Sequence, residues 1–305
     1  MNLVLAGVLW RTCLVYVDDV IVMVESVEQM AERLEEVLGR FRNASLKLKP
    51  TKCRLFQTKV NFLGHIISAA GIEADPEKIR AVAQWPVPTN VTDTRAFVSL
   101  AAYYRKFIKD FSAIAAPLYE LTRKNEKFVW NERRQQAFER LKQSLVSAPV
   151  LALPRDEGAF VVDVDAGPIQ TGGVLQQWQD GELKVVAYFS RLLSRSEEKY
   201  CITKKELLAI VHALKLWKTY LLGRKITLRT DHAALMYLRR TPEPIAQQAR
   251  WLNFIETFHI DLVHRSGVAH RNADSLSRRP CDTDEPCKQC SGKKSQSHNG
   301  AVMNE

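Results

Sequence analysis

The sequence predicts a chain of the α/β (α+β) class that is divided into at least two domains. Patterns typical of β-strands occur at residues 14–24 and again from residue 159 onward, and a run of helical patterns separates them. The 305 residues, 46% of them hydrophobic, exceed what a single hydrophobic core commonly organises. Composition and patterning therefore indicate several folded parts and exclude a disordered chain.

The first block, residues 1–70, is predicted to be a small βαβ-like piece. Two apolar, β-branched runs meet at the adjacent acids Asp18 and Asp19, which predicts a hairpin with carboxylates at its tip. The elements expected after it are a helix over residues 27–41, opened by the capping box Ser26-x-x-Gln29, and a buried strand over residues 60–67.

The second block, residues 71–150, is predicted to be helical. Asp75 followed by Pro76 supplies an N-cap and a first-turn proline, and Trp85-Pro-Val-Pro88 ends the first helix. Helices are expected at residues 77–84, 92–109, 113–123 and 132–146. Pro149, Pro154 and the charged turn at 155–158 then mark a domain boundary.

The third block, residues 151–279, begins with three strand patterns and continues with alternating helices and strands. The capping box Thr203-x-x-Glu206 opens a long helix, and Gly223 ends it. Strands are expected at 159–164, 172–177, 184–189, 225–229 and 258–263, and further helices at 232–239 and 245–256. This order predicts an α/β domain with a mixed five-stranded sheet flanked by helices.

The remaining residues, 280–305, form a polar tail that we expect to have no fixed structure. It carries Cys281, Cys287, Cys290 and His298, but three thiols and one distant imidazole do not match a four-ligand zinc knuckle. The other cysteines, Cys13, Cys53 and Cys201, are scattered singly, and we interpret them as reduced core thiols.

The charge balance points to polyanionic partners. Lysine and arginine number 44 against 34 acidic residues, a net charge of +10, which favours nucleic acid first and an acidic membrane surface second. The apolar N-terminus is interrupted by Arg11, Asp18 and Asp19, and it lacks the features of a signal peptide. A membrane or secreted protein is therefore not expected.

Four acids of the third block lie at the ends of apolar elements, where a sheet would deliver them to one edge: Asp165, Glu206, Asp231 and Asp274. An all-carboxylate site suits hard divalent ions, and two such ions roughly 3.5–4 Å apart are the usual apparatus for cleaving phosphodiesters. The alternative is that Glu206 belongs to a capping box and Asp231 is an N-cap, which explains two of the acids without a metal.

Five motifs in the third block carry a family resemblance. In chain order they are Asp165-Ala-Gly with Gly172-Gly-Val-Leu-Gln176, Tyr188-Phe-Ser-Arg191, Lys205-Glu206-Leu-Leu-Ala-Ile, Thr230-Asp231-His232 and Asn272-Ala-Asp274-Ser-Leu-Ser-Arg278. This series resembles the ribonuclease H domain of gypsy-type LTR retrotransposon Pol polyproteins. The resemblance implies that the four acids bind two Mg²⁺ ions, with Mn²⁺ as a substitute. We expect Asp165 to bridge both ions, because it ends the central strand pattern. Gly167 stands where the family more often has serine, and the carboxylate itself is kept.

A histidine role also follows from the resemblance. Related retroviral ribonucleases H have a mobile histidine about ten residues before the last acid, which implies His264 as a proton shuttle. His270 is the rival, and for both the alternative is a loop histidine that contacts only solvent.

The first block resembles the palm of reverse transcriptases. Tyr16-Val-Asp18-Asp19 resembles their YxDD hairpin, and Phe62-Leu-Gly64-His-Ile resembles the strand that positions the primer end. The resemblance implies metal-binding roles for Asp18 and Asp19. The family's palm has a further catalytic aspartate on an earlier strand, and only 15 residues precede Tyr16, so we expect this chain alone to extend primers poorly or not at all.

The second block resembles the thumb and connection of the same polyproteins. The strings are Trp85-Pro-Val-Pro88, Phe97-Val-Ser-Leu, Tyr103-Tyr104-Arg105-Lys106-Phe107, Pro117-Leu118, Phe128-Val-Trp130 and Ala137-Phe138-x-x-Leu141-Lys142. Arg105, Lys106 and Lys109 are candidates to contact a phosphate backbone, the alternative being solvated lysines behind core aromatics.

We therefore expect a retrotransposon reverse transcriptase/ribonuclease H segment that hydrolyses the RNA strand of RNA:DNA hybrids. Its partners would be such hybrids and template-primer nucleic acid, with no membrane. Its location would be intracellular, in a cytoplasmic particle or the nucleus. The competing hypotheses are a catalytically decayed or repurposed nucleic-acid-binding fragment, and a piece of a longer polyprotein. The oligomeric state is not predicted.

Overall fold

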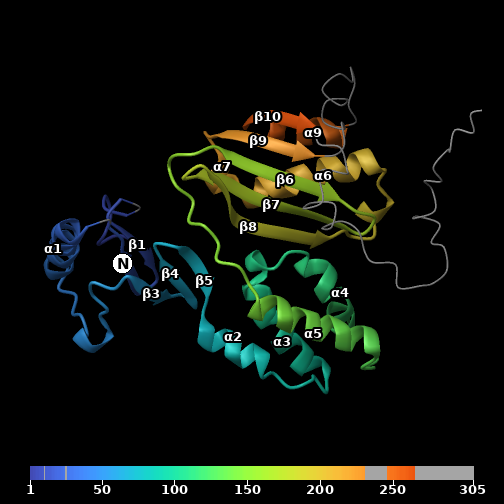
Figure 1. Ribbon diagram of the computed structural model, residues 1–305, viewed down its shortest axis with the longest axis horizontal. Helices are drawn as coiled ribbons and strands as arrows, with labels where there is room; N and C mark the ends of the chain where they lie inside the picture. The colour runs from blue at the N-terminus through green and yellow to red at the C-terminus, as the bar shows by residue number, and fades with distance from the viewer. Residues whose placement is uncertain (10, 25, 231–245, 265–305) are drawn as a thin grey trace, which may run out of the picture. The chain divides into compact units, whose positions relative to one another are not determined.

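The computed structural model describes residues 1–9, 11–24, 26–230 and 246–264 (Figure 1). The chain divides into two compact units, each made of two stretches of sequence. The first unit is Met1–Phe160 with Leu175–Tyr188, and the second is Val161–Val174 with Phe189–Glu305. None of the helices in the described ranges is both long enough and apolar enough to cross a bilayer. The division predicted at residues 70, 150 and 279 stays a prediction.

The N-terminal hairpin has the predicted form. Strands β1 (Cys13–Tyr16) and β2 (Asp19–Val22) are antiparallel, with Tyr16 opposite Asp19. The two turn residues between them are Val17 and Asp18, and Val17 has a φ of 54°. A positive φ at the first turn position alone is the type II′ pattern, which glycine usually fills.

Helix α1 (Val27–Asn43) follows, and the Ser26 side chain accepts a hydrogen bond from the Gln29 amide, as the capping box predicts. Its Val37 and Phe41 are buried in a small core with Leu5, Val8 and Cys13. An exposed basic segment follows α1 and ends in a short 3₁₀ turn, η1 (Pro50–Lys52). Cys13 is thus a core thiol, whereas the same prediction is wrong for Cys201, which is exposed.

The strand predicted over residues 60–67 is wrong, because the chain turns within it. Leu63 and Gly64 have left-handed φ angles of 49° and 66°, the signature of a two-residue type I′ turn. The result is an antiparallel sheet of three strands, β3 (Lys59–Phe62), β4 (His65–Ser68) and β5 (Gly71–Ala74). The first block is therefore two antiparallel pieces around α1, not a βαβ-like unit.

The helical block matches its prediction closely. Its elements are α2 (Pro76–Ala83), α3 (Val91–Tyr103), the 3₁₀ turn η2 (Arg105–Phe107), α4 (Phe111–Leu121) and α5 (Glu132–Val146). The predicted helix over 92–109 ends at Tyr103, and the next residues continue as the 3₁₀ turn. Asp75, Asn90 and Asn131 cap three helices with their side chains. The core packs Phe97, Phe138 and other fully buried side chains.

A five-stranded sheet has the order β10-β9-β6-β7-β8 (Figure 1). Its strands are β6 (Phe160–Ala166), β7 (Gln170–Gln179), β8 (Glu182–Leu192), β9 (Lys225–Thr230) and β10 (His259–His264). Strands β9 and β10 are parallel. Only short turns join β6, β7 and β8, which makes those neighbours antiparallel. The predicted mixed five-stranded sheet is confirmed.

The helices of the second unit are α6 (Ile202–Leu216), α7 (Lys218–Leu221) and α9 (Ala246–Ile255), with a 3₁₀ turn η3 (Glu197–Lys199) before α6. Helix α6 begins two residues earlier than its predicted cap allows. Cys201 is the N-cap and makes no side-chain cap bond, so Thr203 lies inside the helix. The predicted capping box Thr203-x-x-Glu206 is therefore wrong.

Candidate active site

Asp165 lies near the end of β6, a strand in which every residue is buried. Asp163 shares its face of the sheet, because alternate residues of a strand point the same way. Both carboxylates are only 3% exposed. The Asp163 carboxylate lies 3.4 Å from the guanidinium of Arg229 on β9, an ion pair that offsets the cost of burying both charges.

Glu206 is the second buried carboxylate, also 3% exposed, in the second turn of α6. Because α6 begins at Ile202 and has no capping box, helix capping does not explain this acid. Its neighbour Lys205 is 7% exposed and donates a hydrogen bond of 2.7 Å to the Pro168 carbonyl. Pro168 follows Asp165 by three residues, so this contact places Glu206 and Asp165 at the same end of the sheet.

The other predicted ligands lie mostly beyond the structure's description. Thr230 and His264, the last residues of β9 and β10, are paired across the parallel ladder. Asp231 follows Thr230 directly, but Asp231, Asp274 and His270 are outside the described residues, and of His264 only the backbone is described. Within the described ranges, no three Asp, Glu, His or Cys side chains form a metal-binding group.

The two described carboxylates nevertheless fit a hard divalent ion. Carboxylate oxygens are the ligands that Mg²⁺ prefers, and a buried pair of them on rigid elements costs free energy unless a cation or hydrogen bonds compensate it. The donor set at Asp165 and Glu206 is thus of the right chemical type.

A histidine on α6 lies between an arginine and a threonine. The Arg191 guanidinium lies 2.7 Å from Nε2 and 3.4 Å from Nδ1 of His212. Nδ1 also lies 3.2 Å from the Thr171 hydroxyl, within hydrogen-bond distance. Burial, and then the charge of Arg191, lower the pKa of His212 to about 4, so the ring is neutral.

The hairpin acids of the first unit are in a different setting. Asp18 and Asp19 are exposed, as are Tyr16 and Val17, at 58% and 72%. Asp18 lies in the turn of the β1–β2 hairpin, and Asp19 is the first residue of β2, as predicted. The described residues place no third carboxylate beside them.

A second hairpin tip in the first unit is held by two tyrosines. The Tyr103 hydroxyl donates to the Leu63 carbonyl at 2.5 Å, and the Tyr104 hydroxyl donates to the Gly64 carbonyl at 2.9 Å. His65 packs on both tyrosine rings, with centroids 5.3 and 5.6 Å away. Burial is the first cause that raises the pKa of Tyr104 to about 12, so its hydroxyl keeps the donating proton.

The predicted phosphate-contacting residues follow these tyrosines directly. Arg105 is exposed, whereas Lys106 and Lys109 are partly buried, and burial lowers the pKa of each lysine. The Lys106 ammonium lies 5.2 Å from the Phe107 ring centroid. The structure therefore leaves Arg105 as the most accessible of the three cations.

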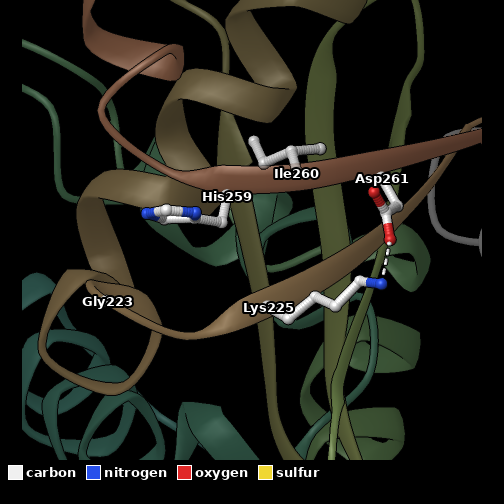
Figure 2. A pocket seen from close by; sticks show the side chains of 5 residues that line it. All are labelled: Gly223, Lys225, His259, Ile260 and Asp261. Atoms are coloured by element: carbon white, nitrogen blue, oxygen red, sulfur yellow. Dashed lines mark ion pairs between the residues drawn. The ribbon is translucent and has the colours of Figure 1, made fainter.

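A hollow of about 480 Å³ lies elsewhere on the second unit, lined by Gly223, Lys225, His259, Ile260 and Asp261 (Figure 2). Lys225 and Asp261 point toward one another there and form an ion pair of 3.0 Å, while His259 extends away from them (Figure 2). Lys225 and His259 are the first residues of β9 and β10, so this hollow is at the opposite end of those strands from Thr230 and His264.

Comparisons with known proteins agree with this architecture. Residues 1–67 match the family model of reverse transcriptase (RNA-dependent DNA polymerase), and residues 130–228 match that of the RNase H-like domain found in reverse transcriptase. A structure of the foamy viral protease-reverse transcriptase in complex with RNA/DNA hybrid superposes with a TM-score of 0.77 and 24% identity, over 94% of this chain and 39% of that one. Two parts of this chain thus match, in order, a reverse transcriptase model and an RNase H-like domain model, and the fold agrees with that of the foamy viral structure.

The relatives of this chain include polyproteins of transposons. The chain is 36% identical over 279 residues to the retrovirus-related Pol polyprotein from transposon 297 of Drosophila melanogaster, covering 91% of this chain and 26% of that protein. It is 34% identical to the Pol polyprotein from transposon gypsy of the same species, covering 88% and 27%. The Tf2-3 polyprotein of Schizosaccharomyces pombe is also 34% identical, covering 86% and 20%. The chain is a relative of the retrotransposon Pol polyproteins, which confirms the predicted resemblance, and it spans about a quarter of their length.

Several residues around the site gave little sequence signal. Asp163 alternates with Asp165 in a buried strand, and that Asp-x-Asp spacing was the available clue. Lys205 and Arg229 are cations that composition alone assigns to the surface, and both are buried. Their partners are distant in sequence and become visible only in the fold.

Proposed function

We propose that the second unit is a ribonuclease H that hydrolyses the RNA strand of an RNA:DNA hybrid with Mg²⁺. The observation that carries the proposal is the pair of carboxylates, Asp165 and Glu206, buried at one end of the sheet. Lys205, on the helix that carries Glu206, donates a hydrogen bond to the loop that follows Asp165. A capping box does not account for the position of Glu206. The family-model match over residues 130–228 includes both acids.

In this mechanism Asp165, Glu206, Asp231 and Asp274 would hold two Mg²⁺ ions, with Mn²⁺ as a substitute. When bound, the ions supply an activated water and neutralise charge on the leaving 3′ oxygen. Asp165 is the proposed bridging ligand, because a fully buried strand fixes its carboxylate. His264, or His270 as its rival, would accept a proton at a ring nitrogen.

We further propose nucleic acid as the partner. The foamy viral structures are described as complexes with an RNA/DNA hybrid and with double-stranded DNA. The net charge of +10 suits the same class of ligand. Arg105, Lys106 and Lys109 would contact the phosphate backbone, and Tyr16, Asp18 and Asp19 would belong to the polymerase site. Contacts with 2′-hydroxyls would distinguish the RNA strand.

The test is cleavage of a labelled RNA:DNA hybrid by the purified chain, first with Mg²⁺ and then with a chelator. Asp165→Asn should slow cleavage by a factor on the order of a thousand, because it removes the bridging ligand. Asp261→Asn is the matched control, since Asp261 is an exposed acid at the far end of β10, and it should cleave at the wild-type rate. Equal rates for Asp165→Asn and the wild type would refute the site.

Binding of the hybrid, measured beside its cleavage, tests the alternative that this chain is a binding module. Gel-shift binding of the hybrid, without cleavage at any Mg²⁺ or Mn²⁺ concentration, would support a fragment that holds nucleic acid and does not cut it. Cleavage that disappears with the chelator would exclude that alternative.

A further inference from the structure

Two side chains of α6 attach this helix to the segment that directly follows Asp165. Lys205 donates from Nζ to the Pro168 carbonyl at 2.7 Å. Nδ1 of His212 and the Thr171 hydroxyl form a hydrogen bond of 3.2 Å. Both contacts lie within the second unit.

The two contacts are made by residues on one side of α6. Lys205 and His212 are seven residues apart, which is about two helical turns and a rise of about 10.5 Å. Pro168 lies in the turn between β6 and β7, and Thr171 is the second residue of β7. The two contacts therefore attach α6 to this turn and to the beginning of β7.

Burial shows that these contacts are structural parts of the interior. Lys205 is 7% exposed and Thr171 is fully buried. A lysine in the first turns of a helix ordinarily extends into solvent, and burying its charge is costly unless a strong acceptor compensates it. The Pro168 carbonyl is such an acceptor, and the loop around it is fixed by two backbone bonds, Gly167 to Gln170 and Leu193 to Ile169, both 2.8 Å.

The His212 side of the second contact is also held by further hydrogen bonds. The Arg191 guanidinium that holds His212 lies 3.1 Å from the Glu197 carboxylate. The other oxygen of Glu197 accepts from the Ser194 amide at 2.8 Å. Arg191 thus connects the end of β8, the segment before α6 and the helix itself.

We propose that Lys205, supported by His212 and Thr171, is a positioning residue that sets the separation of the Asp165 and Glu206 carboxylates. The proposal rests on the function proposed above. Glu206 is adjacent to the first contact, and Asp165 precedes its acceptor by three residues. Losing the contact would let α6 shift relative to β6, which would change the fit of the two acids to one ion. Groups that orient metal ligands typically account for 10–100-fold in metal affinity.

The test measures metal binding apart from cleavage. Mn²⁺ is titrated into the chain without nucleic acid and followed by electron paramagnetic resonance, and the Mg²⁺ concentration for half-maximal cleavage is measured in parallel. Lys205→Met, which keeps length and removes the donor, should raise both by about tenfold. Lys218→Met is the matched control, because Lys218 is an exposed lysine on the adjacent α7, and it should change neither.

Thr171→Val provides the second variant, since it replaces a buried hydroxyl by a methyl group of the same shape. It should raise the Mn²⁺ dissociation constant severalfold, and it carries the test if circular dichroism shows Lys205→Met to be unfolded. A folded Lys205→Met, or failing that a folded Thr171→Val, with wild-type Mn²⁺ binding would overturn the positioning role. Absence of Mn²⁺ binding and cleavage in the wild type would instead refute the proposed function.

Discussion

Gln177 is the side chain whose replacement should most clearly test how the chain enters the sheet. It lies on β7, is fully buried, and faces the segment that leads from the helical block into β6. Its Nε2 donates to the carbonyls of Arg155 and Glu157 at 2.8 Å, and to that of Gly158 at 3.2 Å. Its Oε1 accepts from the Arg155 amide and from Gln179, each at 2.9 Å.

The cost of Gln177→Leu follows from these contacts. Nε2 has two hydrogens, so its three acceptors share two donated bonds, and the side chain makes about four net hydrogen bonds. At about 1 kcal/mol each the loss is about 4 kcal/mol, and the greater burial of apolar surface by leucine offsets about 1–2 kcal/mol. We therefore expect the free energy of unfolding to fall by about 2–3 kcal/mol.

Urea denaturation followed by circular dichroism measures this difference, and hydrogen exchange of the Arg155 amide should become faster in the variant. Gln143→Leu is the control, because Gln143 is exposed on α5, and it should change stability by less than about 0.5 kcal/mol. A loss below about 1 kcal/mol for Gln177→Leu, with unchanged protection at Arg155, would refute the reasoning.

Two further predictions concern the first unit. Val17→Gly should stabilise the chain by about 0.5–1 kcal/mol in thermal denaturation, because glycine relieves the φ of 54°. The control Val15→Gly, within β1, should destabilise the chain. Failure of Val17→Gly to stabilise the chain would contradict the strained turn. Burial raises the pKa of Asp110 to about 6 from 3.8, so its contribution to stability is full below pH 4 and is lost as the pH rises through 6. Asparagine tolerates the left-handed φ of 61°, so Asp110→Asn should keep the fold and flatten the dependence of Tm on pH over that range. Relative to the wild type, its free energy of unfolding should gain about 1 kcal/mol between pH 4 and pH 7. Parallel pH profiles of Tm for the two proteins would count against this prediction.

The sequence was informative wherever local chemistry decides the structure. Asp180 and Gly181 form the two-residue turn between β7 and β8, with φ angles of 56° and 79°, as a hairpin of that composition predicts. Asp75 with Pro76 begins α2 for equally local reasons. Leu63 was not predictable in the same way, because a leucine at positive φ gives no signal, and the strand pattern around it runs on through the turn.

The site was predictable only in part, and for a physical reason. Asp165 and Glu206 were identified by their motifs and by the ends of the elements that carry them. The contacts that orient them join residues far apart in the chain, such as Lys205 with Pro168 and Asp163 with Arg229. Periodicity assigns Lys205 to a helix but not to its interior, since the partner that stabilises a buried ammonium group is a backbone carbonyl without a sequence signature.

The tyrosine pair on α3 has a mechanical consequence for the hairpin that it holds. Tyr103 and Tyr104 are consecutive, and their hydroxyls occupy the carbonyls of both turn residues, Leu63 and Gly64. Opening the turn requires both bonds to break, so the two tyrosines attach it to the C-terminal end of α3. A ligand that displaces this turn would therefore also act on the end of the helix.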